Sequence, residues 1–184
     1  MSVTQWMSWE GGVDLVATTV PGGEQPNVIV HLARLVHTPA GSAASGMIFY
    51  HPDPALPPAF MGFVSTNPTV GAYFGPHIFA GTPFEQAPAL SAVIDVHLNL
   101  PDSVGVKVTI DGFVIETTLA QLGPLEQVNR AFGDPLPFTQ QVLEAAASEQ
   151  SLTINGETIT IYPIPVGLSG GASAVWSPAG VYAR

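Results

Sequence analysis

The sequence predicts a mainly β protein, an antiparallel β-sandwich or β-barrel with a short helical insert around residues 125–148. Three observations favour this fold class. Short runs alternate apolar and polar residues, which is typical of half-buried strands. Nineteen glycines and eighteen prolines interrupt these runs. Asp111–Gly112 and Asn155–Gly156 each separate two runs, as in two-residue hairpins. The length of 184 residues suits one domain over residues 1–184. The choice between sandwich and barrel depends on strand order.

The first part of the chain is expected to form five strands joined by loops rich in proline and glycine. Residues 27–36 carry apolar side chains on both faces, so we expect both faces to be buried or one to form an interface. Residues 51–58 contain four prolines, and proline donates no ladder hydrogen bond, so an extended connection is expected. Residues 75–88 are expected to be irregular or the crossover of a Greek key. The expected strands are residues 12–20, 27–36, 46–50, 60–65 and 70–74.

The central stretch, residues 90–119, has the clearest strand pattern. Residues 90–100 alternate without a break, with one face apolar throughout. The Asp111–Gly112 turn then joins two further runs and sets their register, because a type I′ turn needs positive φ at both central residues. That register places Lys107, the only lysine, opposite Glu116. We interpret the pair as a surface contact worth about 0–1 kcal/mol.

Residues 125–132 and 137–148 are expected to be helical. They lack strand alternation, and Phe138, Val142 and Ala146 recur at helical spacing, with Leu143 beside them. Gly133-Asp134-Pro135 separates the two pieces. The chain is then expected to return to strands over residues 151–161, 172–176 and 181–184.

The composition restricts the class of partner. Charged residues make up 10% of the chain, against about 25% in an ordinary soluble domain. A surface so poor in charge predicts a homo-oligomer or a larger assembly, because uncovered apolar patches would aggregate. The net charge is −10 and the four basic residues are scattered, which argues against nucleic-acid binding. Because the chain has no cysteine, it has no disulfides and no thiolate chemistry.

The sequence shows no recognisable targeting or cofactor motif. The start of the chain has no basic region followed by an apolar one, so we expect no signal peptide and a cytoplasmic location. No apolar run approaches the length of a membrane span. The sequence contains neither a Gly-x-Gly-x-x-Gly fingerprint nor a P-loop, and we expect no cofactor and no metal ion.

The sharpest motif match is the run 167–171, Gly-Leu-Ser-Gly-Gly, which fits the G-x-S-x-G nucleophile elbow. The elbow requires an acid and a histidine after the serine, but no histidine follows His97 and no carboxylate side chain follows Glu157. The run also looks like the G-D-S-G-G box of chymotrypsin-like proteases, with Leu168 in place of the acid. Too few residues follow Ser169 to complete such a domain, so we favour a glycine-rich turn.

Asp95 and His97 are the candidate catalytic pair. They lie two apart on one expected strand, so their side chains share a face. Facing a cavity, Asp95 would orient His97 as a general base. Joined by His31 or His51, the pair would ligate a metal ion. The favoured interpretation is a solvent-facing polar stripe, since a half-exposed strand needs such residues.

Four residues are candidate ligand-binding positions: His31, Tyr50, His51 and Tyr73. His31 lies in an apolar strand, where a hydrogen-bonded core histidine is the competing interpretation. His51 opens the proline-rich segment, which either borders a site or only locks a connection. The tyrosines belong to an aromatic group that lines a pocket or fills the core.

Three functional hypotheses follow. The preferred one is a self-associating, non-catalytic structural or interaction protein, based on low charge and abundant small residues. The second is a carrier of an apolar small molecule, which requires a continuous apolar cavity of at least ~300 Å³. The third is a cofactor-free isomerase or cyclase that uses Asp95 and His97.

Overall fold

The computed structural model describes residues 4–133 and 137–184, and within them the chain is mainly β, as predicted. One short α-helix and one turn of π-helix interrupt the strands of the described part. The strands are β1 (Trp6–Thr18), β2 (Val28–Thr38), β3 (Gly41–Tyr50), β4 (Phe60–Ser65), β5 (Ala89–Ser91), β6 (Val93–Asn99), β7 (Ser103–Ile110), β8 (Phe113–Leu122), β9 (Glu126–Phe132), β10 (Phe138–Ile154), β11 (Glu157–Thr158), β12 (Tyr162–Pro163) and β13 (Ala174–Ala183).

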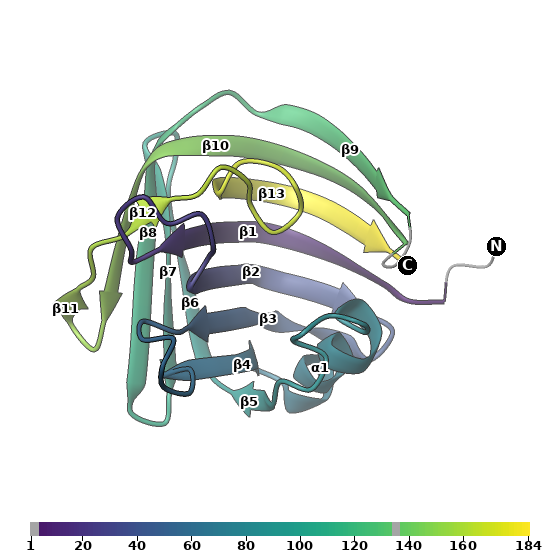
Figure 1. Cartoon of the computed structure of the whole chain (residues 1–184). Coiled ribbons are helices and arrows are strands. Elements are labelled where there is room, and N and C mark those ends of the chain that lie inside the picture. The colour runs from purple at the N-terminus through teal and green to yellow at the C-terminus, as the bar shows by residue number, and fades with distance from the viewer. Residues whose placement is uncertain (1–3, 134–136) are drawn as a thin grey trace.

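The strands form one curled sheet that folds into two layers. The first layer has the order β5-β4-β3-β2-β1-β13-β10-β9, and the second has the order β6-β7-β8-β10. Strand β10 belongs to both, because its first half pairs with β9 and β13 and its second half with β8. In Figure 1 the strands β7 and β8 run upright behind the horizontal strands β1 to β4. The result is a half-barrel, in which the sheet is mixed because β4 and β5 pair in parallel.

The main core lies between the two layers. Alternate residues of each layer point inward, and most of them are fully buried. Burying one such side chain stabilises the fold by about 1.5–3 kcal/mol. The inward residues include Val13, Leu15, Val30 and Ile48 from the first layer and Val106, Val108, Ile115, Leu119 and Leu152 from the second.

A second core covers the outer face of the first layer, defined here as the face that points away from the second layer. The cover consists of helix α1 (Pro68–Tyr73), the π-turn η1 (Phe74–Ile78) and the loop that follows. Their side chains pack on Met47 and Phe63 of the sheet, both of which are buried. Residues 27–36 therefore bury apolar side chains on both faces, which is the first of the two arrangements expected for them.

The strand expected at residues 70–74 is wrong, because this segment is helical. The side chain of Asn67 caps α1 by accepting a hydrogen bond from the Thr69 N–H at 3.0 Å. Pro68 occupies the first turn, where its missing N–H costs nothing. Val70 and Phe74 are four residues apart and both face the sheet, which is helical spacing.

The helical insert expected around residues 125–148 is also wrong, because strands β9 and β10 occupy this region. Val128 pairs with Val142 in the antiparallel ladder. Leu143, which contributed to the apparent helical spacing, is an exposed residue on the opposite face from Val142. This end of the first layer extends beyond the second layer. Because neither face of the strands is fully covered there, apolar and polar residues do not alternate regularly in β9 and the first half of β10. Asp134 and Pro135 lie outside the described residues.

Both predicted hairpins are confirmed. Asp111 and Gly112 have positive φ, and Lys107 pairs with Glu116 at 3.8 Å between Nζ and Oε2. Asn155 and Gly156 also have positive φ and join β10 to the short strand β11. Among the residues that the structure describes, no helix has the length and apolar character needed to cross a membrane.

Candidate functional site

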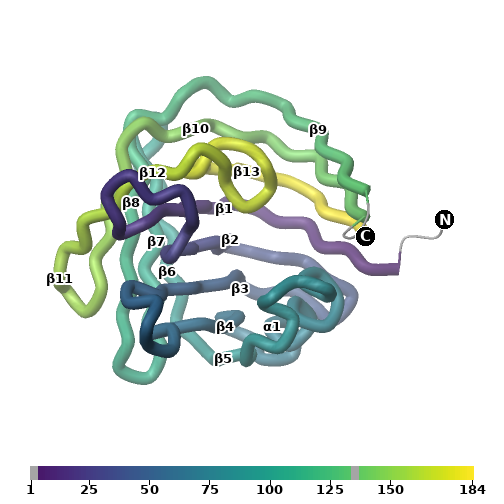
Figure 2. Tube along the Cα trace, viewed as in Figure 1, coloured from purple at the N-terminus to yellow at the C-terminus, as the bar shows by residue number. Residues whose placement is uncertain are grey.

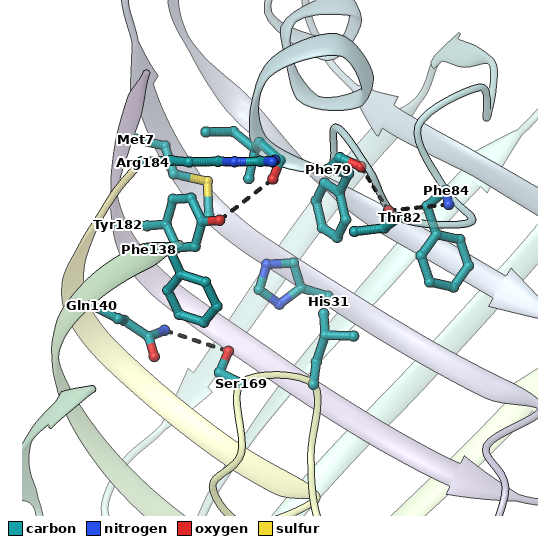
Figure 3. Close-up of a pocket in the computed structure, with 12 residues that line it drawn as sticks. Met7, His31, Phe79, Thr82, Phe84, Phe138, Gln140, Ser169, Tyr182 and Arg184 are labelled. Carbon is teal, nitrogen blue, oxygen red and sulfur yellow. Dashed lines mark hydrogen bonds between the residues drawn. The ribbon is translucent and has the colours of Figure 1, made fainter. Parts of the chain in front are cut away.

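A pocket of about 170 Å³ lies on the outer face of the first layer. On one side it is bordered by η1 and the loop after it, and on the other by the loop between β12 and β13. Figure 2 shows this second loop arching over the strands β13 and β1. Figure 3 shows the pocket itself, with His31 between two groups of aromatic side chains. Its apolar lining consists of Met7, Ile78, Phe79, Phe84, Phe138, Leu168 and Tyr182.

His31 lines this pocket, and Asp14 is its ion-pair partner. They are direct cross-strand partners on β2 and β1, and both side chains point to the outer face. His31 Nδ1 donates to Asp14 Oδ1, because a carboxylate can only accept. The two side chains are 22% and 23% exposed. The other ring nitrogen, Nε2, has no hydrogen-bond partner in the described part of the chain, although its ring lines the pocket.

Asp14 sets the protonation of His31. Partial burial lowers the pKa of His31, but the negative charge of Asp14 and its hydrogen bond raise it by more. The pKa of His31 therefore lies above its usual value of 6.5. The imidazole carries a positive charge further toward neutral pH than a free histidine does.

The ion pair between Arg130 and Glu144 holds the side-chain amide of Gln140 in place beside the pocket. Arg130 makes two hydrogen bonds of 2.7 Å to the carboxylate of Glu144, and each side chain is 12% exposed. Arg130 also donates to Gln140 Oε1 at 3.0 Å. The carbonyl of Gln140 is thereby engaged, and its Nε2 points toward Ser169 Oγ, 3.5 Å away. The hydrogen bonds to Glu144 raise the pKa of Arg130 despite partial burial, so it stays charged.

The glycine-rich run 167–171 forms a tight turn, as the favoured interpretation expects. The Gly167 N–H donates to Gly171 O at 2.8 Å, and the Gly170 N–H donates to Gly167 O at 3.0 Å. A Cβ on Gly171 would lie 2.2 Å from Arg130 Nη2, so a larger residue there requires the guanidinium or the turn to shift. The turn brings Ser169 to the pocket wall next to Gln140, as Figure 3 shows.

Two C-terminal side chains close the pocket. Arg184 Nη1 donates to the Ala80 carbonyl, and Tyr182 Oη donates to Ile78 O at 3.5 Å. Both contacts tie β13 to the cover of the outer face. Burial raises the pKa of Tyr182, and the nearby Arg184 only partly offsets this, so the phenol is neutral and available as a donor.

The four candidate ligand-binding residues do not come together. His31 lines the pocket. Tyr73 is the last residue of α1 and is buried, and its hydroxyl accepts a hydrogen bond from the Trp6 N–H at 3.2 Å. Tyr50 packs against the core between the layers. His51 Nε2 donates to the Leu56 carbonyl at 2.7 Å within the proline-rich segment.

The candidate catalytic residues Asp95 and His97 lie on strand β6 of the second layer. Both are exposed, on the face that points away from the core. Within residues 4–133 and 137–184, no group of three or more His, Asp or Glu side chains is arranged to hold a metal ion. A catalytic role for Asp95 and His97 stays a prediction.

Sequence patterns alone did not single out Asp14, Arg130, Gln140 and Glu144. One signal for Asp14 was present: a hairpin centred between Gly22 and Gly23 places residue 14 opposite residue 31. The helical prediction for residues 125–132 and 137–148 gave no reason to expect Arg130, Gln140 and Glu144 to lie side by side, as they do on the paired strands β9 and β10.

No protein-family model matches the chain, and no curated protein shows significant sequence similarity to it. The site is therefore interpreted from its chemistry. It combines aromatic walls, a cationic histidine and several hydrogen-bond donors, an arrangement suited to holding a small molecule with an acceptor group.

Proposed function

We propose that the protein binds a small, mainly apolar molecule that carries a carboxylate, in the pocket around His31. The observation that carries this proposal is that His31, which is ion-paired to Asp14, lines an aromatic pocket. Asp14 favours the charged imidazole, and this ring, whose Nε2 has no hydrogen-bond partner among the described residues, lines the pocket.

The size of the pocket limits the ligand to about one ring. Apolar cavities of about 150 Å³ accommodate benzene, and this pocket measures about 170 Å³. It is smaller than the ~300 Å³ expected for a carrier of drug-sized molecules. A groove of about 470 Å³ lies on the other side of the 167–171 turn, but its polar lining includes the carboxylate of Glu24.

The polarity of the pocket favours an anionic group. The carboxylate of Asp14 does not line the pocket, and Gln140 Oε1 already accepts from Arg130. The polar groups left for a ligand are mainly donors, among them His31 Nε2 and the hydroxyl of Ser169. A charge-assisted hydrogen bond to a carboxylate contributes about 1.5–3 kcal/mol.

Calorimetric titration with three ring compounds of matched size tests the proposal. Benzoate, benzyl alcohol and benzylamine place an anion, a neutral hydroxyl and a cation on the same ring. We expect benzoate to bind most tightly, and His31→Gln to weaken it about tenfold or more, which corresponds to the loss of about 1.4 kcal/mol.

His51→Gln is the matched control, because His51 is engaged in the proline-rich segment and does not line the pocket. It should leave benzoate affinity unchanged. If none of the three compounds binds saturably, or if benzoate affinity survives His31→Gln, the proposal is wrong.

Self-association is a second candidate function, and exposed apolar side chains on and beside β6 favour it. Val93, Leu98 and Leu100 are 60%, 48% and 46% exposed. Exposed apolar side chains on a strand at the sheet edge favour association. A cofactor-free isomerase or cyclase using Asp95 and His97 stays a prediction, as does a cytoplasmic location. Activity screens of an Asp95→Asn variant and cell fractionation would test them.

A further inference from the structure

We propose that two copies of this chain join edge to edge through β6, in an antiparallel register that places Asp95 of each copy opposite the partner's His97. This inference rests on the proposed self-association and names the surface that makes it. It is independent of the ligand proposed for the pocket, because β6 lies in the second layer and the pocket lies on the outer face of the first.

Strand β6 is an open edge. It is the last strand in the order of the sheet, and within the described residues it pairs only with β7. All seven residues from Val93 to Asn99 are in the ladder with β7, so the strand is extended and offers a row of backbone groups on its other side. Figure 1 shows β6 beside β7, at the back of the molecule.

Only one antiparallel register of β6 with itself places Asp95 opposite the partner's His97. In an antiparallel pair of β6 strands, the numbers of any two residues that lie opposite each other add to the same sum. Inward residues lie opposite inward residues only if this sum is even. A sum of 190 places Asp95 against the partner's Asp95, and a sum of 194 places His97 against the partner's His97. The sum of 192, centred on Val96, places Asp95 against the partner's His97 twice.

This register continues a pattern already present in the second layer. Glu116 on β8 pairs with Lys107 on β7, and Lys107 pairs with Asp95 on β6. The row of side chains thus runs acid, base, acid up to the edge of the sheet. The partner's His97 adds the next donor, and an imidazole N–H donates to a carboxylate in either protonation state of the ring.

The same register covers apolar surface. Leu98 points inward but is 48% exposed, because it lies near the end of the strand. In the proposed pair it lies opposite the partner's Ile94, a partly buried residue that packs on the core. The inward face of the joined sheets would then be apolar across the seam, with Val96 against the partner's Val96.

Sedimentation velocity over a concentration series tests the interface with a charge swap. His97→Asp places like charges opposite each other at both contacts, and Asp95→His places two histidines there. Each single variant should weaken the dimer about tenfold or more. The double variant D95H/H97D restores acid against base with the same composition, and should return within about threefold of wild type.

His51→Asp is the control, since it makes the same change of charge in the proline-rich segment away from β6. It should leave the dimer unchanged, and circular dichroism should show that every variant is folded. A wild-type monomer at all concentrations would contradict self-association itself. If the His97→Asp variant dimerises as wild type does, the proposed β6 interface is wrong. If the double variant D95H/H97D does not recover dimerisation, the proposed register is wrong.

Discussion

Asp14 and His31 are cross-strand partners whose side chains meet on the outer face of the first layer, with the carboxylate accepting from His31 Nδ1. The pair brings an acid and a base together from two strands that are separate in the chain. It also leaves the other ring nitrogen without a partner among the described residues, on a ring that lines an aromatic pocket. The first two predictions follow from this contact.

Asp14→Asn should lower the pKa of His31, because burial then acts without the opposing charge. A histidine with a raised folded pKa contributes stability that is fully present below its unfolded pKa, about 6.5, and is lost as pH rises through the folded value. Wild type should therefore exceed the variant in stability most clearly between about pH 5 and 6.5. Proton NMR titration and urea unfolding at several pH values measure both effects. A His31 pKa unchanged by the substitution would contradict this account.

Benzoate binding should weaken as pH rises through the folded pKa of His31. The reason is that the neutral ring loses its charge and, with it, most of the charge-assisted hydrogen bond. Calorimetry from mildly acidic to mildly alkaline pH should show this decline in wild type. His31→Gln should bind weakly at every pH, and a flat profile in wild type would remove His31 as the anchor.

Glu144→Gln should destabilise the fold by about 2–3 kcal/mol. The Arg130–Glu144 pair is 12% exposed at each partner, so its loss falls between the cost for a fully buried pair and that for a surface pair. Glu116→Gln is the matched control, because the Lys107–Glu116 pair is 45% and 47% exposed. The control should cost about 0–1 kcal/mol in urea unfolding. Equal costs for the two variants would mean that the partly buried pair is no stronger than the exposed one.

Gly171→Ala should destabilise the protein by about 1–3 kcal/mol and weaken benzoate binding. The added methyl group would lie 2.2 Å from Arg130 Nη2, so either the turn or the guanidinium must move. A shift of the turn displaces Ser169 and Leu168 from the pocket wall. Gly133→Ala is the control, since a methyl group there meets no atom of the described residues within 4 Å. Both variants are compared by thermal unfolding and calorimetry, and full binding by Gly171→Ala would show that the turn does not shape the pocket.

Leu152→Ala should cost about 2–5 kcal/mol, because Leu152 is fully buried between the two layers. Leu125→Ala should change stability by no more than about 0.5 kcal/mol, since Leu125 is 51% exposed. Urea unfolding of the two variants tests where the main core lies. A small effect at Leu152 would be inconsistent with tight packing between the layers.

The correct and incorrect sequence predictions differ in a physical way. The runs around Asp111–Gly112 and Asn155–Gly156 are covered on one face, so their alternation is regular, and turn residues adjacent in the chain set the register. Most of residues 125–148 form strands at an end of the first layer that the second layer does not cover. Alternation is weak there, and a chance helical spacing of apolar residues became the stronger pattern.

Local patterns were sufficient for the β class, for most strands and for the hairpin that pairs Lys107 with Glu116, because alternation and turn chemistry act over a few residues. The pocket depended on contacts between distant segments. His31 became its centre only when β1 placed Asp14 beside it and when η1, β10 and the 167–171 turn closed around it. Composition and spacing carry no record of which face a neighbouring strand or loop will cover, so the choice of His31 over Asp95 and His97 as the candidate site came from packing.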